Sequence, residues 1–167
     1  SIYGFMVKGA TGTFVNGPSI TIQDSEIAEP VVTVYNLIKN NLAGTYATTL
    51  VSTGWYSTDS AKPQITVTSA RRTDETANLF DTFREHEETV YVDTWVSSRD
   101  TGATLFGTSS KKRARRLLDD EVKRIINANR KAPSNKLRHI QIADSQPIDE
   151  VSTERKVFRT RHTLRIK

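Results

Sequence analysis

The sequence predicts an α+β fold: a small, mostly antiparallel or mixed β-sheet with two main amphipathic helices packed on it. Segments 30–42 and 111–131 repeat apolar residues every three or four positions, which is the helical period. Segments 64–69, 89–97 and 157–166 alternate apolar with polar residues, as half-buried strands do. Because strands precede, separate and follow the two helices, a single sheet covered by both helices accounts for this order.

An extended segment and the first helix are expected at the amino-terminal end. Residues 2–7 and 13–22 are rich in β-branched and aromatic side chains interrupted by glycines, which indicates short strands or an extended arm. Proline is favoured in the first turn of a helix, so Glu29 and Pro30 are expected to open the first helix. Gly44 is expected to end it as the residue after the last turn. The apolar stripe of this helix consists of Val31, Val34, Tyr35, Ile38 and Leu42.

Short strands and polar loops are expected between the helices. Residues 46–51 are β-prone, whereas 52–63 and 71–88 have the polar or charged composition of loops. The clearest strand is 89–97, whose alternation places two sets of side chains on opposite faces. Those sets are Val90, Val92 and Val96 on one face, and Tyr91, Asp93 and Trp95 on the other.

The second helix and two further strands complete the predicted order. The helix is expected to follow Ser109 or Ser110 as N-cap and to end at Pro133. Strands are expected at 137–143 and 157–166, with a turn region at 145–152. The apolar stripe of the helix is Ala114, Leu118, Val122, Ile125 and Ile126. In the last strand, Phe158, Leu164 and Ile166 share one face, and Arg159, Arg161 and Arg165 share the other.

Length and composition limit the class of protein. A chain of 167 residues is expected to form one domain, 1–167, within which 1–23 make an N-terminal arm or hairpin. It contains no cysteine, which excludes disulfides and cysteine-based metal or redox sites. Since no apolar run approaches the 18 or so residues that span a bilayer and the amino terminus lacks a signal-peptide layout, we expect a soluble intracellular protein without a membrane partner.

The sequence predicts that the protein is not an enzyme and holds no catalytic residue, cofactor or metal. It has no P-loop, no dinucleotide-binding fingerprint, no nucleophile elbow and no zinc-protease motif. His86 lies among Glu85, Glu87 and Glu88, which are residue types that bind metals. Consecutive residues of a strand point to opposite sides, so a solvated acidic loop is the favoured interpretation.

Charge is distributed unevenly along the chain. Residues 1–110 carry seven basic and twelve acidic side chains, whereas 111–167 carry seventeen and seven. Within the second helix, Arg115, Asp119 and Lys123 follow one another at i, i+4 spacing, as do Arg116, Asp120 and Arg124, which is typical of an exposed face with ion pairs. Five cations nevertheless crowd the start of this helix, where its dipole disfavours positive charge: Lys111, Lys112, Arg113, Arg115 and Arg116.

Simple solvation or an external anionic neighbour would each explain these five cations, and for a neighbour two kinds remain open. One is another copy of the chain, with Glu85, Glu87 and Glu88 as the candidate subunit-interface acids that meet the cations. The other is nucleic acid, for which the net charge and the arginine stripe of the last strand argue. Against nucleic acid, the acidic block 119–121 of the same helix would repel phosphates.

Large apolar residues in the polar loops are candidates for contacts with other proteins. Trp55 and Tyr56 lie in loop 52–63, and Leu105 and Phe106 lie in loop 97–110. Such residues often anchor protein–protein contacts, although packing back over the core is an equally good interpretation.

The order and character of these elements resemble the tail terminator, or tail-completion, proteins of long-tailed phages and archaeal tailed viruses. The resemblance covers roughly residues 28–167. It lies in a first helix PVVTVYNLIKNNLAG, strands QITVTS and ETVYVDTWV, a long helix KRARRLLDDEVKRIIN and a final strand RKVFRTRHTLRIK. Other head–tail connector or neck proteins have similar small α+β folds and remain an alternative, as does a basic nucleic-acid-binding module.

The resemblance implies a structural protein of the virion, located in the tail or neck and assembled in the host cytoplasm. Such a protein forms a ring of identical subunits, typically hexameric, on the last ring of the tail tube, ends tube polymerisation and joins the tail to the head connector. The implied partners are the chain itself, the tail-tube protein and the head-connector or neck protein, with DNA only as cargo through the lumen. Candidate residues for contact with the tube or connector are Trp55, Tyr56, Leu105, Phe106, Arg159, Arg161 and Arg165.

Overall fold

The computed structural model of the protein describes most of the chain. The described backbone comprises residues 2–3, 6–8, 14–16, 20–21, 25–76, 84–102, 104–131, 137–151 and 156–167. Side chains are described within 30–70, 87–102, 104–131, 137–150 and 156–167.

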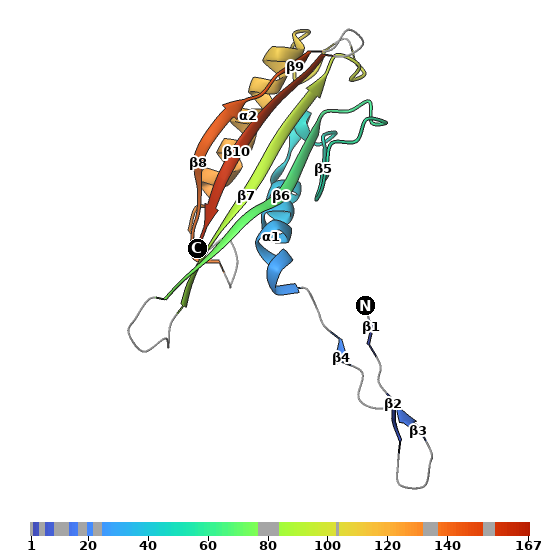
Figure 1. Ribbon diagram of the computed structural model, residues 1–167. Helices are drawn as coiled ribbons and strands as arrows, with labels where there is room; N and C mark the ends of the chain where they lie inside the picture. The colour runs from blue at the N-terminus through green and yellow to red at the C-terminus, as the bar shows by residue number, and fades with distance from the viewer. Residues whose placement is uncertain are drawn as a thin grey trace.

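Six strands pair in one sheet, which confirms the predicted α+β fold (Figure 1). The main path runs in the order β5-β6-β7-β10-β8, and β9 pairs with β10 beside this path. β5 is parallel to β6, and every other pair in the sheet is antiparallel. The bounds are β5 Leu50–Ser52, β6 Gln64–Thr76, β7 Arg84–Ser97, β8 Ile140–Pro147, β9 Glu150–Val151 and β10 Lys156–Ile166.

Both helices cover the same face of this sheet. Helix α1, Ser25–Asn41, packs on β5 and β6, and helix α2, Lys111–Ala128, packs on β7, β8 and β10. Figure 1 views the sheet from the opposite face, with the helices behind it. We call this opposite face the open face, since no helix of the described chain covers it.

Four short strands near the amino terminus pair with one another outside the main sheet. β1, Ile2–Tyr3, pairs antiparallel with β4, Ile20–Thr21, and β2, Met6–Lys8, pairs antiparallel with β3, Phe14–Asn16. The expectation of an N-terminal arm or hairpin concerns this segment.

The hydrophobic core lies between the helices and the covered face. Period-two alternation places Val90, Val92 and Val96 of β7 toward the helices, as the sequence predicts. Leu164 and Ile166 of β10 are buried on the same side, and the two helices contribute their apolar stripes. Those stripes include Val34, Ile38, Ala114, Leu118, Val122 and Ile126, all fully buried.

A β-bulge in β8 changes which of its side chains face the helices. Ile142 pairs with Leu164, but Thr163 pairs with Asp144, so Ala143 is an extra residue in the ladder. Beyond the bulge, Ser145 lies opposite His162, whose ring is on the helix side, and Asp144 lies exposed on the other side.

Several predicted boundaries are wrong. Within the charged segment 71–88, the described residues 71–76 and 84–88 are strand rather than loop, because they extend β6 and β7 with pairs from Arg71–Thr89 to Thr76–Arg84. Backbone pairing does not require apolar side chains. This part of the two strands therefore lacks the alternation of apolar and polar residues by which a strand is recognised in a sequence. β8 extends to Pro147, into the segment expected to be a turn.

The helix ends also differ from expectation. Helix α1 begins at Ser25, so Pro30 lies inside it rather than in its first turn. Gly44 has the left-handed φ of 58° expected of a stop residue, but it opens a short 3-10 turn, Gly44–Tyr46, after the helix has ended at Asn41. Helix α2 ends at Ala128, earlier than Pro133, whereas its N-cap is Ser110 as predicted.

An ion pair near the contact between the helices has a predictable pH dependence. Arg124 donates two hydrogen bonds of 2.8 Å to Glu121 and one of 3.5 Å to the carbonyl of Asn41 in α1. The hydrogen bond from Arg124, opposed by burial and aided by the guanidinium charge, holds the pKa of Glu121 below its ordinary value. Because the folded-state pKa is the lower one, the stabilisation is present above the unfolded-state pKa and is lost as the pH falls through the folded-state pKa.

We therefore expect Glu121→Gln to lower the free energy of unfolding near pH 7 by about 0.2–0.5 kcal/mol, with no difference from wild type in acid. Urea unfolding at neutral and acid pH measures this. Asp120→Asn, at an exposed neighbouring position, is the matched control. A difference that stays constant from neutral to acid pH would contradict the assignment.

Candidate functional site

The amino-terminal end of α2 contains the five cations that the sequence analysis singles out, and the fold uses two of them. The Lys111 ammonium donates to the backbone carbonyls of Asp100 at 2.9 Å and Gly102 at 3.2 Å, which ties the helix to the preceding turn. Arg115 is only 4% exposed. Lys112, Arg113 and Arg116 are exposed, and no anion among the described residues pairs with them.

Arg115 and Asp119 belong to a buried polar cluster between α2 and the sheet. Asp119 accepts hydrogen bonds from the hydroxyls of Thr94 and Thr160, the latter at 2.8 Å, and its carboxylate lies 3.8 Å from Arg115 Nε. Arg115 Nη1 donates to Asp149 at 3.0 Å and to the carbonyl of Arg159 at 3.2 Å. The interpretation of Arg115 and Asp119 as part of an exposed ion-paired face is therefore wrong, although the two do pair.

His162 completes this cluster, and its ring has no exposed surface. Its Nδ1 lies 2.9 Å from Ser145 Oγ, and its Nε2 lies 3.5 Å from Asp119 Oδ1. Carboxylate, imidazole and hydroxyl in this order can activate a serine nucleophile. Here the ring is enclosed and the carboxylate is held by two threonines, so the cluster acts to fix α2 on the sheet.

Sequence reasoning missed the buried cluster, although the spacing contains a signal for it. Arg115 and Asp119 precede Val122 and Ile126 at i, i+4, i+7 and i+11, which is a second row of the buried helix face. His162 likewise shares the parity of Leu164 in β10. Polar residues at positions that the periodicity assigns to the buried face of a helix or strand indicate a buried hydrogen-bonded network rather than an exposed surface.

The arginine stripe of β10 lies on the open face, as predicted, and its charge is largely neutralised there. Asp93 of β7 accepts from Arg159 at 2.8 Å and from two nitrogens of Arg161 at 3.0 Å each. The hydrogen bonds that Arg161 donates to Asp93 raise the pKa of Arg161, so this guanidinium stays charged. The arginines also lie over aromatic rings, Arg159 over Trp95 and Arg161 over Tyr91, each 4.3 Å from the ring centroid.

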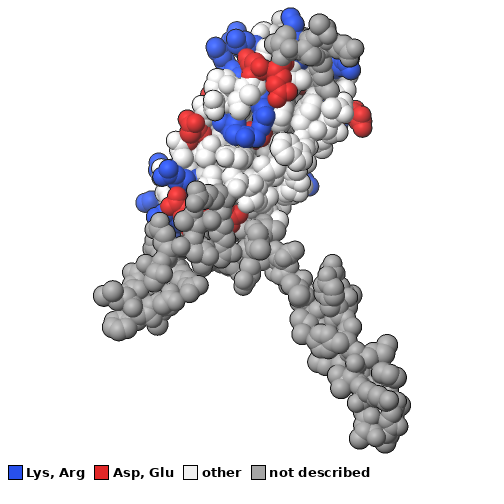
Figure 2. All heavy atoms as spheres, viewed as in Figure 1, with Lys and Arg blue, Asp and Glu red and all other residues white. Residues whose placement is uncertain are grey.

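Arg165 alone of the three candidate arginines is highly exposed, with its Nε 3.7 Å from Glu87. Space-filling atoms in Figure 2 show charged groups mainly near the two ends and along the β8–β10 side of the open face. The β5–β6 side is mostly uncharged in the same view.

Three of the four apolar loop residues pack back onto the protein. Leu105 is buried in the core, and Phe106 packs against Tyr46 with ring centroids 4.7 Å apart. Tyr56 stacks on Trp95 with centroids 4.9 Å apart. Trp55 is 81% exposed, so it is the loop residue that remains available for contact with another protein.

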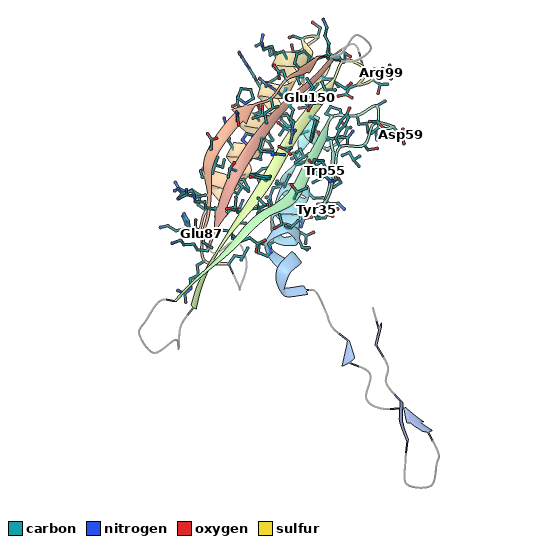
Figure 3. All side chains as sticks on the ribbon, in the orientation of Figure 1. Tyr35, Trp55, Asp59, Glu87, Arg99 and Glu150 are labelled. Carbon is teal, nitrogen blue, oxygen red and sulfur yellow. The ribbon has the colours of Figure 1, made fainter. Side chains whose placement is uncertain are left out.

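The acidic candidates lie far from the basic end of α2. Glu87 is near the other end of the sheet from Arg99 and Glu150 (Figure 3), and the turn carrying Arg99 is the one that Lys111 contacts. Glu87 lies 3.7 Å from both Arg165 and Lys167, and Glu88 is buried and accepts from Ser69. The side chains of Glu85 and His86 lie outside the described residues.

The described residues contain neither a metal-binding cluster nor a helix that could span a membrane. No group of three or more potential ligands able to hold a metal ion is found among them. None of their helices is long and apolar enough to cross a membrane.

No protein-family model matches the sequence, and no curated protein matches it either.

Proposed function

We propose that the chain is a structural virion protein, a tail terminator that forms a ring on the end of the tail tube, ends tube polymerisation and joins the tail to the head connector. The observation that carries the proposal is the set of three exposed cations in the first turns of α2, Lys112, Arg113 and Arg116, without an anion partner among the described residues. We call this set the cation patch.

The cation patch is unfavourable for the isolated chain. Each cation at a helix amino terminus costs about 0.3–1 kcal/mol at low salt through the helix dipole. The fold compensates Lys111 and Arg115 with carbonyls and carboxylates but leaves the patch in solvent. An anionic surface on an adjacent protein would offset this cost, and contacts between unlike surfaces of identical subunits close a ring when the rotation between subunits closes.

The open face favours protein assembly over nucleic-acid binding. A phosphate-binding stripe needs cations that are free to meet phosphates. Arg159 and Arg161 are instead shared with Asp93, and Arg159 is buried. Trp55 presents an aromatic side chain of the kind that dominates protein–protein contacts.

Charge reversal of the cation patch is expected to abolish ring formation without weakening the fold. In Lys112→Glu/Arg113→Glu/Arg116→Glu the new acids suit the helix dipole, so α2 should become more stable while assembly is lost. Light scattering at several protein and salt concentrations measures the assembly, and electron microscopy of purified tail tubes mixed with the protein shows whether tube ends are capped.

The matched control is Arg130→Glu/Lys131→Glu, which reverses exposed charges just beyond the other end of α2. This control should assemble and cap tubes like wild type. A wild-type protein that neither forms rings in solution nor binds tube ends would overturn the proposal. Salt-sensitive binding to duplex DNA by such a monomer would support the nucleic-acid-binding module instead.

A further inference from the structure

The loop between β5 and β6, residues 53–63, is fixed to the rest of the fold by hydrogen bonds and a ring contact. Two hydrogen bonds join Ser57 to the buried side chain of Gln64, at 2.9 Å from the Ser57 amide and 2.7 Å to its carbonyl. The carbonyl of Ala61 accepts from the amide and the hydroxyl of Thr101, at 2.8 and 3.0 Å. Together with the stacking of Tyr56 on Trp95, these bonds fix the loop in the isolated chain.

Two side chains of this loop, Trp55 and Asp59, are exposed to solvent (Figure 3). Trp55 is preceded by Gly54, whose φ of 154° is rarely adopted by residues with a side chain. No ion pair joins Asp59 to another described residue. Because the hydrogen bonds of the loop fix the backbone that carries this large aromatic, less backbone entropy is lost on contact, which favours Trp55 as an interface anchor.

Both groups attract cations, the indole through its ring face and the carboxylate through its charge, and the protein shows both contacts elsewhere. On the open face, Arg159 lies over Trp95 while bonded to Asp93, and Arg161 lies over Tyr91 while bonded to the same carboxylate. An aromatic ring beside a carboxylate therefore already receives an arginine twice within one chain. An indole face is the strongest cation-binding ring among the side chains.

We infer that Trp55 and Asp59 of one copy receive the cation patch of α2, chiefly Arg113 and Arg116, of a second copy. Within one chain the two surfaces belong to opposite sides, because α2 lies on the covered face whereas Tyr56, next to Trp55, stacks on the open face. The helix layer of one subunit thus meets the open side of the next, a contact between unlike surfaces that forms a ring when the rotation between neighbouring subunits closes. This inference rests on the proposed ring.

The acidic end of the sheet is a poorer partner for the cation patch. Glu88 is buried, and Glu87 is already flanked by Arg165 and Lys167. Lys62 shares the loop with Asp59, so the loop has no net negative charge and selectivity must come mainly from the indole. Trp55→Ala should accordingly weaken the contact more than Asp59→Asn does.

Sedimentation velocity of two single-surface variants tests the inference. Trp55→Ala retains the cation patch, and Arg113→Glu/Arg116→Glu retains the loop. Each variant alone should associate about 30-fold or more weakly than wild type, as expected for an interface anchor. Mixed in equal amounts, they should form heterodimers that cannot extend, because each supplies the surface that the other lacks.

Two further variants separate the possible outcomes. Trp55→Phe keeps a weaker aromatic surface and should restore part of the association, and Glu87→Ala should assemble like wild type. If wild type assembles, in solution or on tube ends, while Trp55→Ala assembles equally well or Glu87→Ala fails, the inference is wrong and the proposed ring stands. If wild type itself does not assemble in either setting, the proposed function and the inference fail together.

Discussion

Asp119→Ala should lower the free energy of unfolding by about 3–5 kcal/mol, the cost of removing one member of a buried ion pair. Asp119 is 6% exposed, accepts from Thr94 and Thr160, and lies 3.8 Å from Arg115. Its loss leaves two buried hydroxyl groups without this acceptor and removes the buried carboxylate beside Arg115, which keeps only Asp149 as an anionic partner. Urea unfolding followed by circular dichroism gives the difference.

The neighbouring position supplies the control for Asp119. Asp120→Ala removes the same charge from an exposed site one residue along the same helix, and should change stability by no more than about 0.5 kcal/mol. The double variant Arg115→Met/Asp119→Leu should recover part of the loss, because it leaves fewer unpaired charges in the interior. Equal effects of Asp119→Ala and Asp120→Ala would show that the buried cluster does not stabilise the fold.

Asp93→Ala should destabilise the fold by a similar amount, about 3–5 kcal/mol, from the other face of the sheet. Asp93 is buried and accepts hydrogen bonds from both Arg159 and Arg161. These two arginines lie two residues apart on the same face of β10. Without it, two guanidinium groups on the same strand repel each other, and the buried Arg159 over Trp95 keeps only the exposed Glu150, 3.8 Å away, as an anionic partner. Chemical unfolding monitored by tryptophan fluorescence follows this change, since Trp95 reports on the same site.

Asp144→Ala is the matched variant for Asp93. Asp144 also lies on the open side of the sheet, opposite Thr163, but it is exposed. Its replacement should have little effect on stability. A small effect of Asp93→Ala, comparable to that of Asp144→Ala, would mean that solvent compensates both arginines and that the ion pairs on the open face contribute little.

The fold class and the faces of the strands were predictable because burial leaves a periodic mark on the sequence. Val90, Val92 and Val96 alternate with Tyr91, Asp93 and Trp95, and the structure places the two sets on opposite faces as predicted. In the charged part of β6 and β7, residues 71–76 and 84–88, apolar and polar side chains do not alternate in this way. Pairing there depends on the backbone, which a pattern of side chains cannot report.

The candidate site was harder to predict, because charge alone does not distinguish a surface from a buried pair. Lys111 and Arg115 belong to the same basic run as Arg113, yet the fold uses the first two internally. Their partners, the carbonyls of 100 and 102 and the carboxylate of Asp149, are distant in sequence or lie in the backbone. Trp55 and Tyr56 are adjacent in sequence, yet Tyr56 stacks on Trp95 and Trp55 is exposed. The sequence does not show this difference, because Trp95 is distant along the chain.

The extra residue at Ala143 changes the parity of β8 without ending its pairing with β10. Before the bulge, the even-numbered positions Ile140 and Ile142 face the helices; after it, the odd-numbered Ser145 does. Removing Ala143 would leave a regular ladder in which Asp144 still lies opposite Thr163 and Ser145 opposite His162. Related chains can therefore lose this one residue without turning a side chain of β8 to the other face, whereas a single residue inserted elsewhere in the strand would need a second bulge to keep the same faces.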